Sequence, residues 1–138
     1  MIRAVLDTNV LASGFVSDGG TPGQLLTFWG EAAYELVVSA PILKELERTL
    51  SKPYFRERYR PDQVKKALER LQRHAVTAAV TVVVQGVATH PEDDLVLATA
   101  VSAVADLLVT GDHRLRHVQE HQGVTILTPR EFLAMLTP

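Results

Sequence analysis

The sequence has 138 residues, 46% of them hydrophobic and 22% charged, a composition typical of a globular domain with one core. It contains no cysteine, which excludes disulfide scaffolds and thiolate metal sites, and its formal net charge is only −2. The first residues, MIRAVLDTN, resemble neither a signal peptide nor a membrane span, because Asp7 interrupts a short apolar run. We therefore expect a single domain over residues 1–138, located in the cytoplasm and not in a membrane.

The first half of the chain alternates between short apolar runs and helical patterns. Residues 2–6 form an apolar run of the kind that is buried on both faces of a parallel sheet. Asp7 or Thr8 can cap a helix over residues 9–16. The pattern then predicts a turn over 17–23, a helix over 21–29, a strand over 34–38, a helix capped by Ser39 and running to about 51, and a basic, aromatic connector over 51–61.

The second half continues the alternation of strands and helices. It predicts a helix from Pro61, a strand over 80–84, a helix over 92–103, strands over 106–109 and 124–127, and a helix over 129–136. Such alternation predicts an α/β fold, a three-layer α/β/α sandwich with a central parallel sheet of about five strands. If the first strand is central, the winding reverses there, and the strand over 106–109 lies beside it.

Carboxylates occur where this fold would bring them together. Asp7 ends the first strand, Asp112 follows the strand over 106–109, Asp93 and Asp94 open the helix between strands, and Glu45 lies one turn into another helix. Open α/β sheets bind ligands beyond the carboxyl ends of their strands. Acids that converge there repel one another unless a cation neutralises them, and oxygen ligands favour Mg²⁺ or Mn²⁺. The sequence therefore indicates a site for a divalent ion.

Each acid also has a purely structural interpretation. Asp7 can be a helix cap, Asp93 and Asp94 can complement a helix dipole, and Asp112 can be a turn residue. Glu45 can pair with a neighbouring basic residue, Lys44 or Arg48. Singly, these interpretations are about as good as the functional one. Together, acids at two strand ends and at two helices are less easily explained by structure alone.

The segments VLDTNVLASG, ILKELERTL and PEDDLVLATAVSAVADLLVTGDHRL resemble, in order and spacing, the motifs of PIN domains, a family of small metal-dependent nucleases. The likeness covers nearly the whole chain and extends to the VapC-like toxin components of bacterial toxin–antitoxin systems. The resemblance implies a PIN-like fold and hydrolysis of RNA by water with Mg²⁺ or Mn²⁺. It also implies two partners besides RNA: a small antitoxin and a second copy of the chain, with Phe15, Leu26 and Trp29 as candidate exposed apolar residues.

The resemblance also implies roles for individual residues. The catalytic acids would be Asp7, Glu45, Asp94 and Asp112, with Asp94 preferred over Asp93 because it leads into Leu97-Ala98. Asp7, Asp94 and Asp112 would hold the ion, Glu45 would hold a second ion or orient the water, and Asp93 is a further metal candidate. The supporting polar residues would be Thr8, Asn9 and Thr110. The chain departs from many relatives at His90 and Arg114, where an acid is common, and both changes reduce the negative charge.

Positive charge is concentrated in one segment. Residues 44–73 contain ten Lys or Arg and five acids, whereas the rest of the chain contains four basic and eleven acidic residues. This segment predicts a polyanion partner, with RNA-binding candidates Lys44, Arg48, Lys52, Arg56 and Arg58; a solvated helical face is the alternative. The aromatic residues Tyr54, Phe55 and Tyr59 either stack on bases or pack against protein.

Three other interpretations are open at this point. His113, His117 and His121 recur every four residues, a spacing that can build a zinc site on a helix. A phosphatase that forms an aspartyl-phosphate would carry a second acid two residues after Asp7, where this chain has Asn9. A non-catalytic module that binds RNA or a protein partner would keep the fold without needing all the acids.

Overall fold

A six-stranded sheet lies at the centre of the computed structural model, which describes residues 1–17 and 19–138. The strand order is β3-β2-β1-β4-β6-β5, with β1 (Arg3–Leu6), β2 (Glu35–Val38), β3 (Val76–Thr77), β4 (Leu107–Val109), β5 (Glu120–His121) and β6 (Val124–Leu127). The strands from β3 to β6 in this order pair in parallel, and β5 pairs antiparallel to β6. The predicted α/β sandwich is therefore confirmed, with six strands in place of about five. The turn expected over 17–23 includes Asp18, which lies outside the described residues.

The winding of the chain reverses at β1. This strand pairs with β2 on one side, where Val5 faces Val37, and with β4 on the other, where Val5 faces Leu108. The Asp7 amide continues the second ladder by donating to the Val109 carbonyl at 3.0 Å. The carboxyl ends of β1 and β4 therefore meet, as the sequence predicts, and form the edge where open α/β sheets bind ligands.

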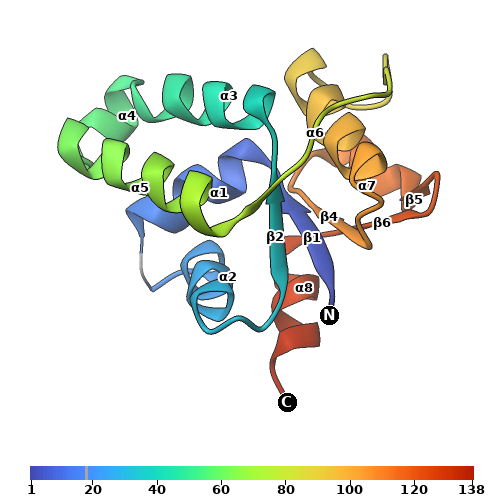
Figure 1. Cartoon of the computed structure of the whole chain (residues 1–138), viewed down its shortest axis with the longest axis horizontal. Helices are drawn as coiled ribbons and strands as arrows, with labels where there is room; N and C mark the ends of the chain where they lie inside the picture. The colour runs from blue at the N-terminus through green and yellow to red at the C-terminus, as the bar shows by residue number, and fades with distance from the viewer. Residues whose placement is uncertain (18) are drawn as a thin grey trace.

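Helices cover both faces of the sheet, and both chain ends lie near the amino end of β1 (Figure 1). Their bounds are α1 (Thr8–Val16), α2 (Thr21–Gly30), α3 (Ala40–Leu50), α4 (Pro53–Arg56), α5 (Pro61–His74), α6 (Pro91–Ser102), α7 (His113–Val118) and α8 (Pro129–Leu136). Many begin with proline in the first turn, where the missing N–H has no helical partner to lose. Helix α2 packs against α1 and α8, and α3 packs against α5 and α6.

The central strands supply a rigid platform because both of their faces are covered. Val5 and Leu108 are completely buried, and burying an aliphatic side chain of this size contributes about 1.5–3 kcal/mol. Beside them, the Tyr34 and Phe132 rings meet edge to face at 4.9 Å between centroids. Side chains at the carboxyl ends of these strands are thus held on a backbone that is fixed by packing.

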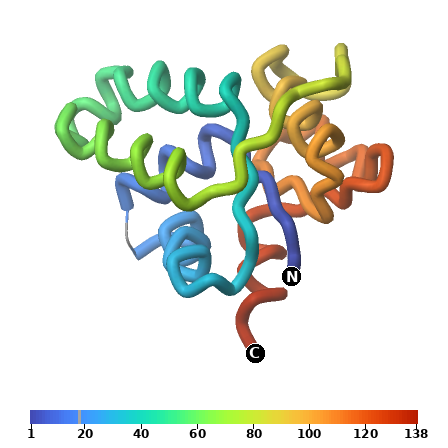
Figure 2. The backbone as a smooth tube through the Cα atoms, viewed as in Figure 1, coloured from blue at the N-terminus to red at the C-terminus, as the bar shows by residue number. Residues whose placement is uncertain are grey.

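The prediction of a strand over residues 80–84 is wrong, because these residues do not form one. Val76 and Thr77 pair with β2 instead, directly after α5, and β2 ends opposite Thr77. The β-branched run that follows therefore has no neighbouring strand, and Val83 is 84% exposed. This segment crosses from α5 over β2 towards α6 (Figure 2).

The histidine repeat does not lie on one helix. Helix α7 ends at Val118, because Gln119 has a φ of 66°, and the chain then turns into the β5–β6 hairpin. His113 and His117 stack at 5.7 Å between ring centroids, but His121 belongs to β5. The hypothesis of a helical zinc site is therefore wrong.

Two smaller expectations also differ from the structure. The connector over 51–61 contains a helical turn, α4. Leu26 and Trp29, expected to be exposed, are 5% and 7% exposed because they pack into the core, and Phe15 is partly buried against it. These side chains stabilise the fold and do not present a free apolar surface.

Candidate active site

Asp7 is a buried carboxylate at the carboxyl end of β1. It is 3% exposed, and one oxygen caps α1 by accepting from the Val10 amide at 2.9 Å, while the other accepts from the Thr110 hydroxyl. Burial raises the pKa of Asp7 above its ordinary value, although these hydrogen bonds oppose the change, and the negative charge of Asp112 raises it further. Asp7 is thus a helix cap, but capping does not account for its closeness to a second acid.

Asp112 follows β4 and is held at the same edge of the sheet. It caps α7 by accepting from the Leu115 amide at 2.8 Å, and its own amide donates to the Thr110 hydroxyl oxygen at 2.9 Å. Partial burial acts to raise its pKa, but hydrogen bonds from Leu115 and Thr89 lower it below the ordinary value. Thr110 therefore links Asp7 to Asp112, donating to one and accepting from the backbone of the other.

Asp93 faces these two acids from the first turn of α6. Asp7, Asp93 and Asp112 line one cleft of about 510 Å³, which we call the acid cleft. Burial raises the pKa of Asp93 to about 6, and the negative charges of Asp7 and Asp112 contribute to this shift, while His90 opposes it. The three carboxylates repel one another across the cleft, and this is the electrostatic state that a divalent cation would relieve.

Asp94 is engaged elsewhere. It is 7% exposed, and its two oxygens accept from three consecutive backbone amides, those of Gly86 at 3.0 Å, Val87 at 3.1 Å and Ala88 at 2.7 Å. It does not line the acid cleft. The preference for Asp94 over Asp93 as the third acid therefore does not agree with the geometry, because Asp94 holds the loop that precedes α6.

That loop forms one wall of the acid cleft. Beyond the three amides bound by Asp94, the Thr89 amide lies 3.4 Å from each oxygen of Asp112, and His90 lines the cleft. Arg114 donates to the Gly86 carbonyl at 3.0 Å from the other side. Asp94 and Arg114 together fix the loop against the acids, so the departure from relatives at Arg114 has a structural role here.

Glu45 lies beside the acid cleft, not within it. It lines an adjoining hollow of about 270 Å³ with Lys52 and Asp93, and we call this the Glu45 hollow. Its carboxylate pairs with Arg48 at 3.0 Å, one turn along α3. Since Asn9, His90 and Asp93 line both spaces, the Glu45 hollow and the acid cleft adjoin.

The three predicted supporting residues surround the same edge. Thr110 is completely buried and hydrogen-bonded to Asp7, as described above, and Asn9 is exposed between the two spaces. Thr8 lines the Glu45 hollow, and its buried hydroxyl has no hydrogen-bond partner among the described residues. An unpartnered buried hydroxyl is costly, so it marks a position for a further ligand or water.

The donor set fits a hard divalent cation. The acid cleft supplies three carboxylates, and the adjoining Thr8 hydroxyl and Glu45 carboxylate are also oxygen donors. Over residues 1–17 and 19–138, no three acidic or histidine side chains lie close enough to form a closed metal cluster as they are oriented here. These oxygen donors line two adjoining spaces, and their side chains would have to move closer together to bind one ion.

Comparison with known proteins agrees with this architecture. The family model described as PIN domain matches residues 3–114, which contain every acid discussed above. The chain belongs to the PIN domain family. Membership of this nuclease family supports hydrolysis of phosphodiester bonds. No curated protein matches the sequence.

The fold also matches a solved structure. The chain is similar to VapBC2 from Rickettsia felis, in a structure bound to a DNA fragment from their promoter, with a TM-score of 0.60 and 13% sequence identity. The match covers 91% of this chain and 97% of that chain. At this identity the match supports the fold alone.

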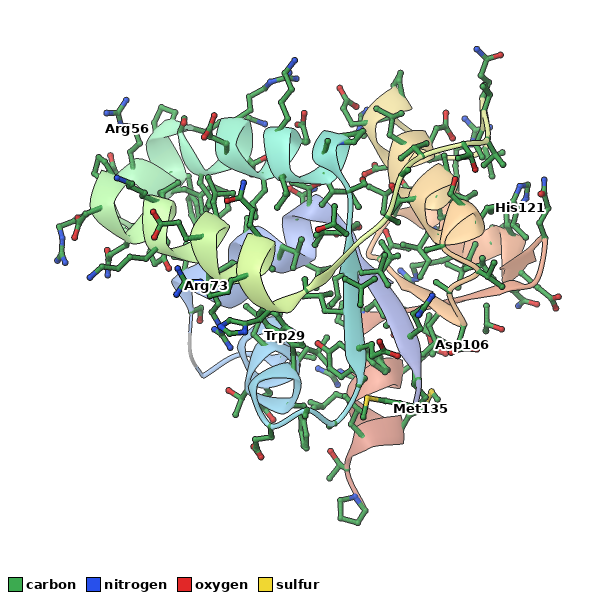
Figure 3. All side chains as sticks on the ribbon, in the orientation of Figure 1. Trp29, Arg56, Arg73, Asp106, His121 and Met135 are labelled. Carbon is green, nitrogen blue, oxygen red and sulfur yellow. The ribbon has the colours of Figure 1, made fainter. Side chains whose placement is uncertain are left out.

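The predicted RNA-binding residues of this PIN domain extend away from the acids along α3 and α4. Lys52 reaches the Glu45 hollow, while Lys44 and Arg48 line a third space of about 460 Å³ between α3 and α6, which we call the α3–α6 groove. Arg58 lies 3.8 Å from the centre of the Tyr54 ring, and Arg56 projects outward at the far end of the molecule (Figure 3).

The aromatic residues of this segment divide between the two interpretations. Phe55 and Tyr59 pack against the core, whereas Tyr54 is 59% exposed with Arg58 over its ring.

Thr89 and the loop that Asp94 holds were not predicted as part of the site. The adjacent acids at 93–94 are the sequence feature that could have indicated this loop. Adjacent helical residues point in different directions, so only one of the two carboxylates can face the cleft and the other must have a different partner.

Proposed function

We propose that this PIN domain is a divalent metal-dependent ribonuclease, the toxin component of a toxin–antitoxin pair. One observation carries the proposal: Asp7, Asp93 and Asp112, from three different elements, line one cleft at the point where the sheet reverses. Carboxylates are not brought together in this way by capping or by helix dipoles alone. Membership of the PIN family supports phosphodiester hydrolysis as the reaction.

Asp7, Asp93 and Asp112 would hold Mg²⁺ or Mn²⁺. When bound, such an ion supplies charge neutralisation at the scissile phosphate and lowers the pKa of a coordinated water. Asp94, predicted from the sequence as the third acid, would instead act indirectly by fixing the loop over residues 86–90.

The chain's own residues keep the donors in place. Thr110 holds one oxygen of Asp7 and the backbone of Asp112, so the two strand-end acids cannot separate without breaking a buried hydrogen bond. Glu45, in the adjoining hollow, is positioned to accept a hydrogen bond from an attacking water, or to hold a second ion. Its present partner, Arg48, would be free to contact phosphate once Glu45 turned towards the cleft.

RNA is the preferred substrate because positive charge leads to the acids along one helix. Lys44, Arg48 and Lys52 recur every four residues of α3 and its C-terminal continuation, and all three line spaces beside Glu45. Exposed Tyr54 with Arg58 stacked on it offers a flat cationic surface suited to a base of a single strand. Arg56, at the outer end of this series, would contact the strand furthest from the acids.

A protein partner is part of the proposal. The similarity in fold to VapBC2 supports a small antitoxin as that partner. A second copy of the chain is proposed as another partner from the resemblance to VapC-like toxins alone. The α3–α6 groove is a suitable surface, because Leu95 is 46% exposed beside it. No helix in the described part of the chain is long and apolar enough to cross a membrane.

The test is cleavage of a mixed-sequence single-stranded RNA pool with Mn²⁺, comparing the wild type with Asp7→Asn and with a chelated sample. We expect cleavage by the wild type only. Equal cleavage by Asp7→Asn would contradict the assignment of the site. Absence of cleavage by folded wild-type protein, without stabilisation by Mn²⁺, would favour a non-catalytic binding module instead.

A further inference from the structure

The hollows at the carboxyl edge of the sheet adjoin one another in series. The α3–α6 groove shares Thr8 and Glu45 with the Glu45 hollow, which shares Asn9 and Asp93 with the acid cleft. The acid cleft shares His113 with a further space of about 390 Å³ beside α7 and β6, which we call the α7 hollow. The proposed function uses the path from α3 to the acids, and it leaves the α7 hollow without a role.

The α7 hollow is lined by groups that suit a nucleotide. His113, Arg116 and His117 face it from α7, and Ile126 and Leu127 of β6 give it an apolar floor. Its one acid, Glu131, is committed to the start of α8, where it accepts from the Thr128 amide at 2.9 Å. The hollow therefore combines cationic and hydrogen-bonding side chains with apolar surface and has little free negative charge.

Arg116 is available for a ligand, in contrast to its neighbour Arg114. Arg114 is occupied by the Gly86 carbonyl at 3.0 Å. The Arg116 side chain is exposed, and its guanidinium makes no hydrogen bond or close ion pair with the described residues. Its charge lowers the pKa of Glu131, after the larger effect of the hydrogen bonds from Thr128. A free guanidinium next to an acidic cleft is well placed for a phosphate, which it can bind through two parallel hydrogen bonds.

The two histidines add a stacking surface. The His113 and His117 rings are 5.7 Å apart between centroids with 28° between their planes, and both side chains are exposed. Flat rings that flank a phosphate site are typical of single-stranded nucleic acid binding, because every base has a face to stack.

We propose that the α7 hollow is a second RNA subsite, which binds a phosphate through Arg116 and a base against His117. This subsite would lie across the acid cleft from α3, so a single strand would pass the acids with basic contacts on both sides. The inference rests on the proposed function for the identity of the ligand. It assigns the strand a path that the basic segment alone does not define.

The test is the affinity for a fluorescein-labelled mixed-sequence RNA of about twelve nucleotides, measured by fluorescence anisotropy. Asp7→Asn is the parent in every sample, so that no RNA is cut. In this background Arg116→Ala is compared with Arg130→Ala, which removes an exposed arginine of α8 that does not line the hollow. We expect Arg116→Ala to weaken binding roughly fivefold and to reduce the salt dependence by about one phosphate contact, with no change for Arg130→Ala.

The histidine is tested by two further variants. His117→Ala is expected to weaken binding roughly threefold, while His117→Phe, which keeps a flat ring, retains the affinity. Equal affinities for Arg116→Ala and Arg130→Ala would overturn the subsite, even if the wild type cleaves RNA. If that result came with a change from dimer to monomer for Arg116→Ala, the hollow would be a protein contact instead. Weaker binding by Arg116→Ala together with no cleavage by the wild type would uphold the subsite and refute the nuclease.

Discussion

Two hollows of nearly equal volume lie at opposite ends of the sheet, and they differ in charge. The hollow at the amino end is about 480 Å³ and is lined by Trp29, Tyr34, Arg70 and others, with Glu35 as its single acid. The acid cleft at the carboxyl end is about 510 Å³ and is lined by three aspartates. Volume therefore does not distinguish a functional site in this molecule.

The distinguishing property is whether groups of like charge face one another. At the amino end, Arg70 lies 4.6 Å from the centre of the Trp29 ring, and the Tyr34 hydroxyl donates to the Leu25 carbonyl at 2.7 Å. At the carboxyl end, burial and mutual repulsion raise the pKa values of Asp7 and Asp93. Stored repulsion of this kind is typical of a site that is completed by a ligand.

The largest expected effect is on catalysis, at the carboxyl end. Asp93→Asn is expected to lower the rate of RNA cleavage in Mn²⁺ roughly 100-fold or more, because it removes an ion ligand. Its fold should persist, since the substitution also removes a repelled charge. Single-turnover cleavage, with circular dichroism as the control for folding, measures both. A rate close to that of the wild type would show that Asp93 is not a ligand.

Asp94, next to Asp93 in the sequence, is expected to affect the stability of the fold. Asp94→Asn is expected to lower the free energy of unfolding by about 2 kcal/mol, because an amide cannot accept from all three backbone N–H groups as a carboxylate does. Urea unfolding without metal measures the difference from the wild type. Asp93→Asn is the control, and unfolding curves that coincide for Asp94→Asn and the wild type would contradict the structural role.

The pH dependence of stability should report the repulsion directly. Because the folded pKa of Asp93 is raised from 3.8 to about 6, its contribution to stability is fully present below pH 3.8 and is lost as the pH rises through about 6. In metal-free protein we therefore expect the melting temperature of the wild type to fall, relative to Asp93→Asn, between these values. If the melting temperatures of the wild type and Asp93→Asn changed equally with pH across this range, the raised pKa of Asp93 would be contradicted.

The smallest effect is expected at the amino end. Arg70→Ala removes the cation over Trp29 and should cost about 0.5–1 kcal/mol of stability while leaving RNA cleavage unchanged. The same unfolding and cleavage assays measure it. Loss of cleavage with an intact fold would mean that the amino-end hollow takes part in the function.

The sequence predicts well those features that depend on local pattern. The strand over 124–127, the helix cap at Ser39 and the placement of β4 beside β1 follow from apolar runs, capping residues and the rules of winding. The first helix was expected to be capped by Asp7 or Thr8, and Asp7 is the cap. Features decided by where a neighbouring strand ends, or by which distant groups a side chain binds, were not predicted. Residues 80–84 have the composition of a strand but lie beyond the end of β2.

The candidate site likewise has features that the sequence predicts and features that it does not. The order of acids along the chain identifies the edge of the sheet where Asp7 and Asp112 meet. It does not decide between Asp93 and Asp94, because the helical rotation between adjacent residues and the amides of residues 86–88 determine which carboxylate faces the cleft. The α7 hollow was also not predicted, since it depends on where β6 and α8 pack against α7.

Whether the acid cleft holds the metal is tested most directly by calorimetric titration of Mn²⁺ into the metal-free wild type, Asp93→Asn and Arg70→Ala. We expect the wild type and Arg70→Ala to bind an ion at the acid cleft, with affinity reduced at least tenfold in Asp93→Asn. Equal binding of Mn²⁺ by the wild type and Asp93→Asn, or no binding by any of the three, would contradict the assignment of the acid cleft as the metal site.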